Sequence, residues 1–415
     1  MPLHERQQKH LQKICGALGS SDWSTVRHGI SLLEEIDDPQ MWSYFGEGLQ
    51  NFRTESLVEG KIATLVDPAH QENVAFYVAA HCGLFDNCPE LYLENYHNVT
   101  DLGWTSRLRD THTITFVTFS SLSCPAGLEK APTLKNLNFH NCSSLVSFHG
   151  LHNLNNLETL ELICCEGITN LQGGKNLNHL KSLDVFSCSG LQSLNGLEEL
   201  HTLTGLSIID CQALHDIRSI AKVPFLQGVL LVACPNLSNI RPLEELNEIE
   251  FVGLCHLPNL PTLEPLASLS SVKHLQIDQC DAVDNIEPLK NLGKLQQLEV
   301  SHLGQLTNLN AISGLTNLTS LTITSERSFT DLHVIHTLTS LEKLHIYAPQ
   351  PKLKPAKIAQ LTSLQELSLP FHSSTDLSAL QNLRNLRELH LFPLTPEPIN
   401  TANIERPTLN ISQHY

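Results

Sequence analysis

Histidine and carboxylate side chains recur in the middle of this 415-residue chain in an arrangement that suggests chemistry. His256, His274 and His302 come from three neighbouring segments, and Asp278 and Glu299 accompany them. Imidazole and carboxylate groups serve as ligands in zinc sites and as proton carriers in acid–base sites. A metal-dependent enzyme is therefore one function to weigh against the rest of the sequence.

The spacing of these histidines argues against that function. His256 and His302 occupy equivalent places two segments apart, roughly 10 Å by the spacing of neighbouring strands, and His274 occupies a different place. Some clustering is expected in a chain with 22 histidines, and we interpret these three as solvent-facing. The sequence contains no HExxH, no GxSxG and no glycine-rich phosphate loop. We predict no catalytic residues, no metal ligands and no cofactor.

Half of the twelve cysteines form a second pattern, in which each follows the previous one by 23 residues or by twice that interval. They are Cys142, Cys165, Cys188, Cys211, Cys234 and Cys280. Stacked thiols can bind a metal or take part in redox reactions, but side chains that repeat in parallel point alike and do not converge on an ion. We expect buried structural thiols that pack or hydrogen-bond the backbone, without disulfides.

These cysteines mark one place in a longer repeat, LxxLxLxxCxxLxxLxxLxxLxx. Its copies begin every 23 residues from Leu134 to Leu364, and another begins at Leu386 after a step of 22. Two weaker copies begin at Cys88 and Thr111, which makes fourteen units. A fixed period of this length is the mark of a solenoid.

Each part of the unit predicts a structure, with positions counted from the first residue of the unit. Positions four and six are apolar in all fourteen units, from Leu91 and Leu93 to Leu389 and Leu391. Alternation at period two predicts a strand, and strands stacked unit on unit form a parallel sheet over a continuous core. The LxxLxxLxx that follows has period three and predicts short 3₁₀ or helical turns on the convex side.

The unit resembles the leucine-rich repeat and is most similar to the short-repeat bacterial type seen in internalins. The segments 240–243, 263–266 and 286–289, which read IRPL, LEPL and IEPL, match that family's convex turn, and LTNLTSLTI at 315–323 matches its strand. The resemblance covers about residues 88–394. It implies an α/β solenoid, an arc with a parallel sheet on its concave face, and a non-enzymatic role in binding another protein. The chain departs from the family by often having cysteine where asparagine is usual.

Three parts are expected along the chain: residues 1–87 as a helical N-terminal cap, 88–394 as the solenoid and 395–415 as a polar C-terminal tail without the repeat register. Four amphipathic helices are predicted in the cap. Ser21 or Asp22, Asp38 and Asp67 are the predicted N-caps, the last two followed by proline.

The composition indicates which class of partner and which cellular compartment to expect. The chain has 26 basic and 43 acidic residues, a net charge of −17, which disfavours nucleic acid and anionic membranes as partners. No apolar run is long enough to span a membrane, and the first sixteen residues are too polar for the signal peptide that internalins carry. Together with the cysteines, this favours the cytoplasm. The alternative is a translocated bacterial effector that acts on a host protein.

The predicted binding site lies on the concave face, at unit positions three, five, seven and eight. Nine acids and a single base, Lys343, occupy these positions, so a partner with a basic and apolar surface is expected. Position seven also carries a run of apolar residues for which the fold has no structural need. This run and two apolar residues beside it are called the apolar strip, which consists of Ile163, Phe186, Ile209, Val232 and Cys255 with Leu230 and Phe251. The predicted partner-binding residues are Glu161, Ile163, Asp184, Phe186, Ile209, Asp210, Leu230, Val232 and Phe251.

Overall fold

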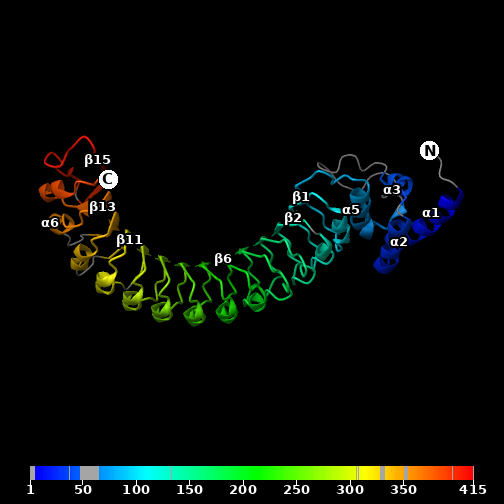
Figure 1. The fold of residues 1–415 in the computed structure, drawn as a ribbon, viewed down its shortest axis with the longest axis horizontal. Coiled ribbons are helices and arrows are strands. Elements are labelled where there is room, and N and C mark those ends of the chain that lie inside the picture. The colour runs from blue at the N-terminus through cyan, green and yellow to red at the C-terminus, as the bar shows by residue number, and fades with distance from the viewer. Residues whose placement is uncertain are drawn as a thin grey trace. The chain divides into compact units, whose positions relative to one another are not determined.

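The computed structural model describes residues 5–36, 38–46, 65–131, 133–304, 306, 308–327, 332–349, 354–394 and 396–414. The chain forms two compact units, residues 1–203 and 204–415. In each unit the strands follow one another in chain order in a parallel sheet, with turns on the opposite side (Figure 1). The predicted boundaries at 87/88 and 394/395 do not coincide with this division, and they stay predictions.

The first unit begins with helices α1 (Glu5–Leu18), α2 (Trp23–Ile36), α3 (Pro39–Phe45) and α5 (Gln71–His81). The 3₁₀ turn η2 (Pro68–His70) precedes α5. The carboxylate of Asp22 accepts the N–H of Thr25 at 3.0 Å, and that of Asp38 accepts the N–H of Gln40 at 2.8 Å. Asp67 accepts from Ala69 in the same way. The predicted N-caps are therefore confirmed, with Asp22 as the cap of α2.

Helix α5 packs on the first repeat. Asn73 is fully buried, and its side-chain oxygen accepts the N–H groups of Thr100 at 3.0 Å and Asp101 at 3.1 Å. The ring of Phe76 stacks on that of Trp104, with centroids 4.7 Å apart. This contact supports the proposal that the helices cap the stack, because the inward side chains of a first repeat would otherwise meet water.

The strands confirm the predicted repeat. The first unit contains β1 (Glu90–Glu94), β2 (Thr113–Val117), β3 (Asn136–His140), β4 (Thr159–Ile163) and β5 (Ser182–Phe186). The second contains β6 (Gly205–Ile209), β7 (Gly228–Val232), β8 (Phe251–Cys255), β9 (His274–Asp278), β10 (Gln297–Ser301), β11 (Ser320–Thr324), β12 (Lys343–Tyr347), β13 (Glu366–Phe371), β14 (Glu388–Pro393) and β15 (Asn410–Gln413). Strands β1 to β14 all begin at position three of a predicted unit.

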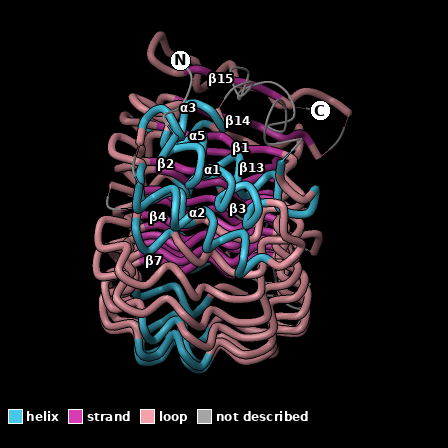
Figure 2. Tube along the Cα trace, turned by 90° about the vertical axis from the view of Figure 1, so that its right-hand side faces the viewer, coloured by secondary structure: helices cyan, strands magenta, loops and turns pink. Residues whose placement is uncertain are grey.

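Positions four and six form the core of both sheets. Their side chains are buried in all fourteen units. Equivalent positions of neighbouring repeats lie side by side. Leu160 pairs with Leu183 within residues 1–203, and Leu206 pairs with Val229 within residues 204–415. Figure 2 shows the strands as stacked rungs with loops on either flank. The fold is therefore the predicted α/β solenoid of leucine-rich repeat type.

The turns opposite the strands are mostly 3₁₀ helices, as predicted. They are η3 (Gly103–Arg107), η4 (Leu128–Lys130), η5 (Leu197–Glu199), η6 (Arg218–Lys222), η7 (Arg241–Glu245), η8 (Glu264–Ser268), η9 (Glu287–Asn291), η10 (Asn310–Gly314), η11 (His333–Thr337) and η12 (Ser378–Asn382). One short α-helix, α6 (Pro355–Ile358), lies among them.

Glycine or proline occupies position seventeen in seven of the repeats. Within residues 1–203, four repeats have glycine there, with φ between 101° and 106°: Gly127, Gly150, Gly173 and Gly196. A Cβ at Gly196 would lie 2.4 Å from backbone atoms of Leu171, so a larger residue does not fit. In the second unit Pro242, Pro265 and Pro288 occupy the same position, where a ring that fixes φ and lacks an N–H suits the first turn of a helix.

The C-terminal segment continues the repeat register, unlike the expectation for residues 395–415. Ile411 of β15 pairs with Leu389 of β14. Gln413 takes the inward position, and its side-chain amide accepts the N–H of Ile399 at 2.9 Å and donates to the carbonyl of Ile399 at 3.0 Å. A glutamine can therefore stand in a leucine position, because a backbone segment folded beneath it satisfies its polar atoms.

Replacing Leu206 by alanine should lower the free energy of unfolding by about 2–5 kcal/mol, because the cavity left by this inward side chain is filled only partly. Leu206 is 2% exposed. Chemical denaturation followed by circular dichroism measures the change, and a broadened or split transition is expected since each unit contacts only its neighbours.

The matched control is Phe225→Ala, which truncates a side chain that is 59% exposed in a turn. It should change the free energy of unfolding by no more than about 0.5 kcal/mol. A transition unchanged by Leu206→Ala would show that the strand faces the other way.

Candidate functional site

The sheet face, defined as the side of each sheet that carries positions three, five and seven, points away from the core. Along β4, β5, β6 and β7 these positions are half-buried, and the positions between them are buried. Tyr92 and Tyr347 are the exposed large apolar side chains of this face among the described residues. The face therefore presents side chains that the core does not need.

At Asp210, position eight lies just beyond the end of the strand, and the prediction that Asp210 contacts a partner stays a prediction. This residue follows β6 with φ 56°, in the left-handed region, and Cys164, Ser187, His256 and His302 do the same after their strands. The backbone turns there after one last ladder bond, such as the N–H of Asp210 donating to the carbonyl of Val232 at 2.9 Å. Asp210 also accepts a bond from Gln212 at 2.5 Å. The period-two rule ends where the strand ends.

The first unit carries the N-terminal part of the apolar strip. Ile163 and Phe186 are in-register neighbours on β4 and β5, and both are half-buried. Their flanking acids are also neighbours. Glu161 lies 2.8 Å from Nε2 of His140, and Asp184 accepts a hydrogen bond from the hydroxyl of Ser182 at 2.9 Å. Intramolecular partners thus hold both carboxylates beside the apolar pair.

The second unit carries the remainder of the strip, where Ile209, Val232 and Cys255 lie in register on β6, β7 and β8. Gly253 explains how Leu230 and Phe251 pack there. A Cβ on Gly253 would lie 2.5 Å from Cδ1 of Leu230 and 3.3 Å from Cζ of Phe251, so both side chains fill the space above this glycine. Leu230 and Phe251 are half-buried as a result, a packing that side-chain position alone could not predict.

Two of the three histidines singled out in the sequence, His256 and His302, meet a shared carboxylate, whereas no such contact joins His274 to it. Asp278 lies 2.9 Å from Nδ1 of His302 and 3.7 Å from Nε2 of His256, although these histidines come from units on either side of it. Both remain partly exposed. Burial, reinforced by the charge of Asp278, raises the pKa of Glu299. Among the described residues, no three histidine, cysteine or acidic side chains are placed to hold a metal ion.

One group resembles a hydrolase triad but lacks access. His345 lies 2.8 Å from the hydroxyl of Ser368 and 3.5 Å from a carboxylate oxygen of Glu366. Ser368 is only 1% exposed, however, so a substrate cannot reach its hydroxyl. His390 makes an equivalent contact with Ser412 at 2.6 Å. This repetition from unit to unit indicates a structural row and not a nucleophile.

The cysteine ladder consists of buried thiols that donate to backbone carbonyls. Cys165 lies 3.3 Å from the carbonyl of Phe139 and Cys280 lies 3.5 Å from that of Leu254. Both carbonyls belong to the preceding unit, and all twelve cysteines are free. Burial raises the pKa of Cys234 to about 11 and that of Cys280 to about 12. The predicted packing and hydrogen-bonding role of these thiols is confirmed.

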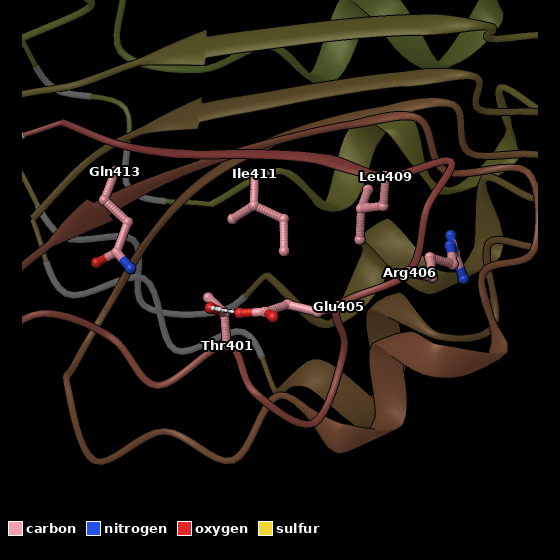
Figure 3. A pocket seen from close by; sticks show the side chains of 6 residues that line it. All are labelled: Thr401, Glu405, Arg406, Leu409, Ile411 and Gln413. Atoms are coloured by element: carbon pink, nitrogen blue, oxygen red, sulfur yellow. Dashed lines mark hydrogen bonds between the residues drawn. The ribbon is translucent and has the colours of Figure 1, made fainter.

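A hollow of ≈ 540 Å³ lies at the C-terminal end, beneath β15. The side chains of Leu409 and Ile411 point into it, and Thr401 and Glu405 lie opposite, joined by a hydrogen bond of 3.1 Å (Figure 3). Arg406, which also lines the hollow, donates to the carbonyls of Leu383 and Leu386. These bonds fasten the segment below β15 to the turn side, so the hollow is the partly filled end of the stack.

Sequence reasoning missed a row of aromatic rings near this end, on β12 to β15. The ring centroids of Tyr347 and Phe392 are 5.2 Å apart, and those of Phe392 and His414 are also 5.2 Å apart. Tyr347 and Phe392 stand at position seven two units apart, with Pro370 between them. The shared position seven was the only sequence signal for this contact. It is a weak one, because the repeat between them has Pro370 and not an aromatic residue at that position.

The comparisons with known proteins agree with this geometry at the level of fold. No family model matches the chain, and no curated protein matches it. Among solved structures, an internalin from Listeria monocytogenes is 19% identical, with 91% of this chain and 95% of that chain covered and a TM-score of 0.50. A leucine-rich repeat protein from Leptospira interrogans is 19% identical over 75% of this chain and 92% of that chain, with a TM-score of 0.46. The likeness to the internalin shows the leucine-rich repeat fold.

Within the described residues, no helix has both the length and the apolar character that crossing a bilayer requires.

Native thiol reactivity should follow burial. Eight cysteines are buried, so a thiol reagent should modify at most the other four in the native protein and all twelve after denaturation. Burial keeps the reagent away from these eight thiols, and the raised pKa values of Cys234 and Cys280 also leave little thiolate there. Mass spectrometry of the labelled peptides gives the count, and rapid native labelling of Cys234 or Cys280 would contradict the burial.

The raised pKa of Glu299 predicts a pH-dependent gain in stability on its removal. The folded carboxyl keeps its proton to higher pH than the unfolded one, so its destabilising effect appears as pH rises through those two pKa values. Glu299→Gln should therefore raise Tm at about pH 7 and leave it nearly unchanged at about pH 3. Calorimetry measures Tm at both pH values. The control is Glu90→Gln, which changes an exposed acid of β1. A pH-independent effect of Glu299→Gln would refute the explanation.

Proposed function

We propose that this protein is a non-enzymatic scaffold that binds another protein on its sheet face. The leucine-rich repeat neighbours support a role in protein interaction in general. The finer assignment rests on one observation: Ile163 and Phe186 form an in-register apolar pair on a face that the core does not require, with Glu161 and Asp184 beside them. The partner surface that fits such a patch is apolar at its centre and basic around it.

The remaining residues of the strip extend the proposed contact on the second unit. They are Ile209, Leu230, Val232 and Phe251, with Asp210 following β6. Strands held by their neighbours on both sides lose little conformational freedom on binding, so a partner meets a pre-organised surface. The acids of the face raise the rate of encounter with a basic partner, and this contribution weakens as salt is added.

The proposed setting is the cytoplasm of a bacterium. Twelve free cysteines, eight of them buried in the stack, support a reducing compartment. The acidic balance of the chain, with a net charge of −17, supports a protein partner and not nucleic acid or an anionic membrane. A non-enzymatic role is supported by the burial of Ser368 and by the contacts of His256 and His302 with the carboxylate of Asp278.

Phe186 is the proposed anchor, because an aromatic side chain near the centre of an interface contributes more than its neighbours. Phe186→Ala should weaken partner binding by about 2 kcal/mol or more, roughly 30-fold in Kd, while Tm changes little. The partner is first retained on the wild-type protein from a lysate of the source cell, and wild type and variant are then titrated against it.

Phe225→Ala is the matched control, since it removes an equally large ring from a turn outside the sheet face. It should leave the Kd at the wild-type value. Equal affinity of wild type and Phe186→Ala for the retained protein would rule out the strip as the contact and shift attention to the helical cap.

A further inference from the structure

The ring row formed by Tyr347, Phe392 and His414 is a built feature of the second unit. Strand β13 separates β12 from β14, so the backbones bearing Tyr347 and Phe392 stand about 9.6 Å apart by strand spacing. Their ring centroids nevertheless lie 5.2 Å apart, in an edge-to-face arrangement with an interplanar angle of 77°. Both rings therefore lean toward each other over the intervening strand, where Pro370 is buried. Tyr347 remains 37% exposed.

A polar row runs beside the ring row at position five, and it is satisfied within the protein. His345, Ser368, His390 and Ser412 are in-register neighbours across β12 to β15. The histidines contact the serines at 2.8 Å and 2.6 Å, and Ser412 also contacts Nε2 of His414 at 2.9 Å. Burial lowers the pKa of His345 against the opposing pull of Glu366, so this ring is neutral near pH 7. His345 therefore adds no positive charge beside the ring row.

A third row, at position three, carries an excess of negative charge. Lys343, Glu366, Glu388 and Asn410 are in-register neighbours on the same four strands. Lys343 pairs with Glu366 at 3.2 Å, and Asn410 donates to Glu388 at 2.9 Å. Two carboxylates thus stand against a single ammonium group, with the carboxylate of Glu388 held by a neutral partner.

We propose that the ring row and the carboxylate row together bind an extended peptide with two basic side chains four residues apart. One cationic side chain lies on the rings of Tyr347 and Phe392, and the other lies at Glu366 and Glu388. Ring faces attract cations through their quadrupole, and the cation is most often an arginine guanidinium, which can also stack flat on them. The carboxylates of Glu366 and Glu388 supply the negative charge that complements the second cationic side chain of the peptide.

The spacing follows from strand geometry. Positions three and seven of one strand are four residues apart, which is about 13 Å in extended backbone. Residues i and i+4 of an extended peptide are separated by the same distance and point to the same side. The inference does not rest on the function proposed above, because it concerns other strands and a ligand defined by its own charge pattern.

The test uses the full chain and three dye-labelled peptides that differ only in their basic residues. The first has two arginines four residues apart in an alanine, glycine and serine background, the second has the same composition with adjacent arginines, and the third has citrulline in place of both arginines. Fluorescence anisotropy at low salt measures Kd. The spaced peptide should bind on the order of tenfold more tightly than either of the others.

Variants assign the binding to the two rows. Tyr347→Ala, Phe392→Leu and the double variant Glu366→Gln with Glu388→Gln should each weaken the spaced peptide on the order of tenfold, and Tyr347→Phe should retain binding. Tyr92→Ala is the control, because Tyr92 is a 65% exposed ring between Glu90 and Glu94 on the sheet face of β1. It should leave Kd unchanged, and Tm of each variant checks the fold.

Three results would overturn the proposal. Equal affinity for the spaced and the adjacent-arginine peptide would show charge attraction without a defined site. Unchanged binding by folded Tyr347→Ala and Phe392→Leu would remove the rings from it. Tighter binding of the citrulline peptide, or of a neutral proline-rich peptide offered alongside, would show that the rings take an uncharged ligand.

Discussion

Every strand of this solenoid is constrained by the same requirement: its inward side chains must meet those of the next strand at the same position. Leu160 beside Leu183 and Leu206 beside Val229 are examples. A shift of one residue would turn a strand's leucines toward water, so pairing without any shift is the arrangement that keeps the core dry. The same pairing aligns the outward side chains into rows, so the chemistry of the sheet face comes in such rows.

The rows differ in their capacity to bind a ligand, because some of their polar groups already form hydrogen bonds within the protein. Ladder thiols such as those of Cys165 and Cys280 donate to carbonyls of the preceding repeat, and the histidines and serines of the position-five row contact one another. These rows stabilise the stack and offer little to a ligand. The apolar pair of Ile163 and Phe186 and the rings of Tyr347 and Phe392 have no such duty. They are the surfaces on which binding is proposed.

Both ends of the chain solve the problem that a stack poses, since a terminal strand has an inward face without a neighbour. At the N-terminal end, buried Asn73 bonds backbone groups of the first repeat. At the C-terminal end, Gln413 replaces a leucine and bonds Ile399, while Arg406 holds the segment below through two backbone carbonyls. Polar side chains thus close the ends where apolar ones would meet water.

The sequence by itself determined the fold, because a 23-residue period repeated fourteen times leaves few ways to bury the leucines at positions four and six. It also determined the N-caps at Asp38 and Asp67 and the packing of the cysteines, which depend on local spacing. Only the tertiary structure decided what the sheet face looks like. The backbone turns into the left-handed region at Asp210, Gly253 leaves space that Leu230 and Phe251 fill, and the ring of Tyr347 reaches that of Phe392 across an intervening strand. Those outcomes depend on side-chain conformation and on which residues the neighbouring repeats carry. A repeat pattern describes only what the repeats share, so it does not contain this information.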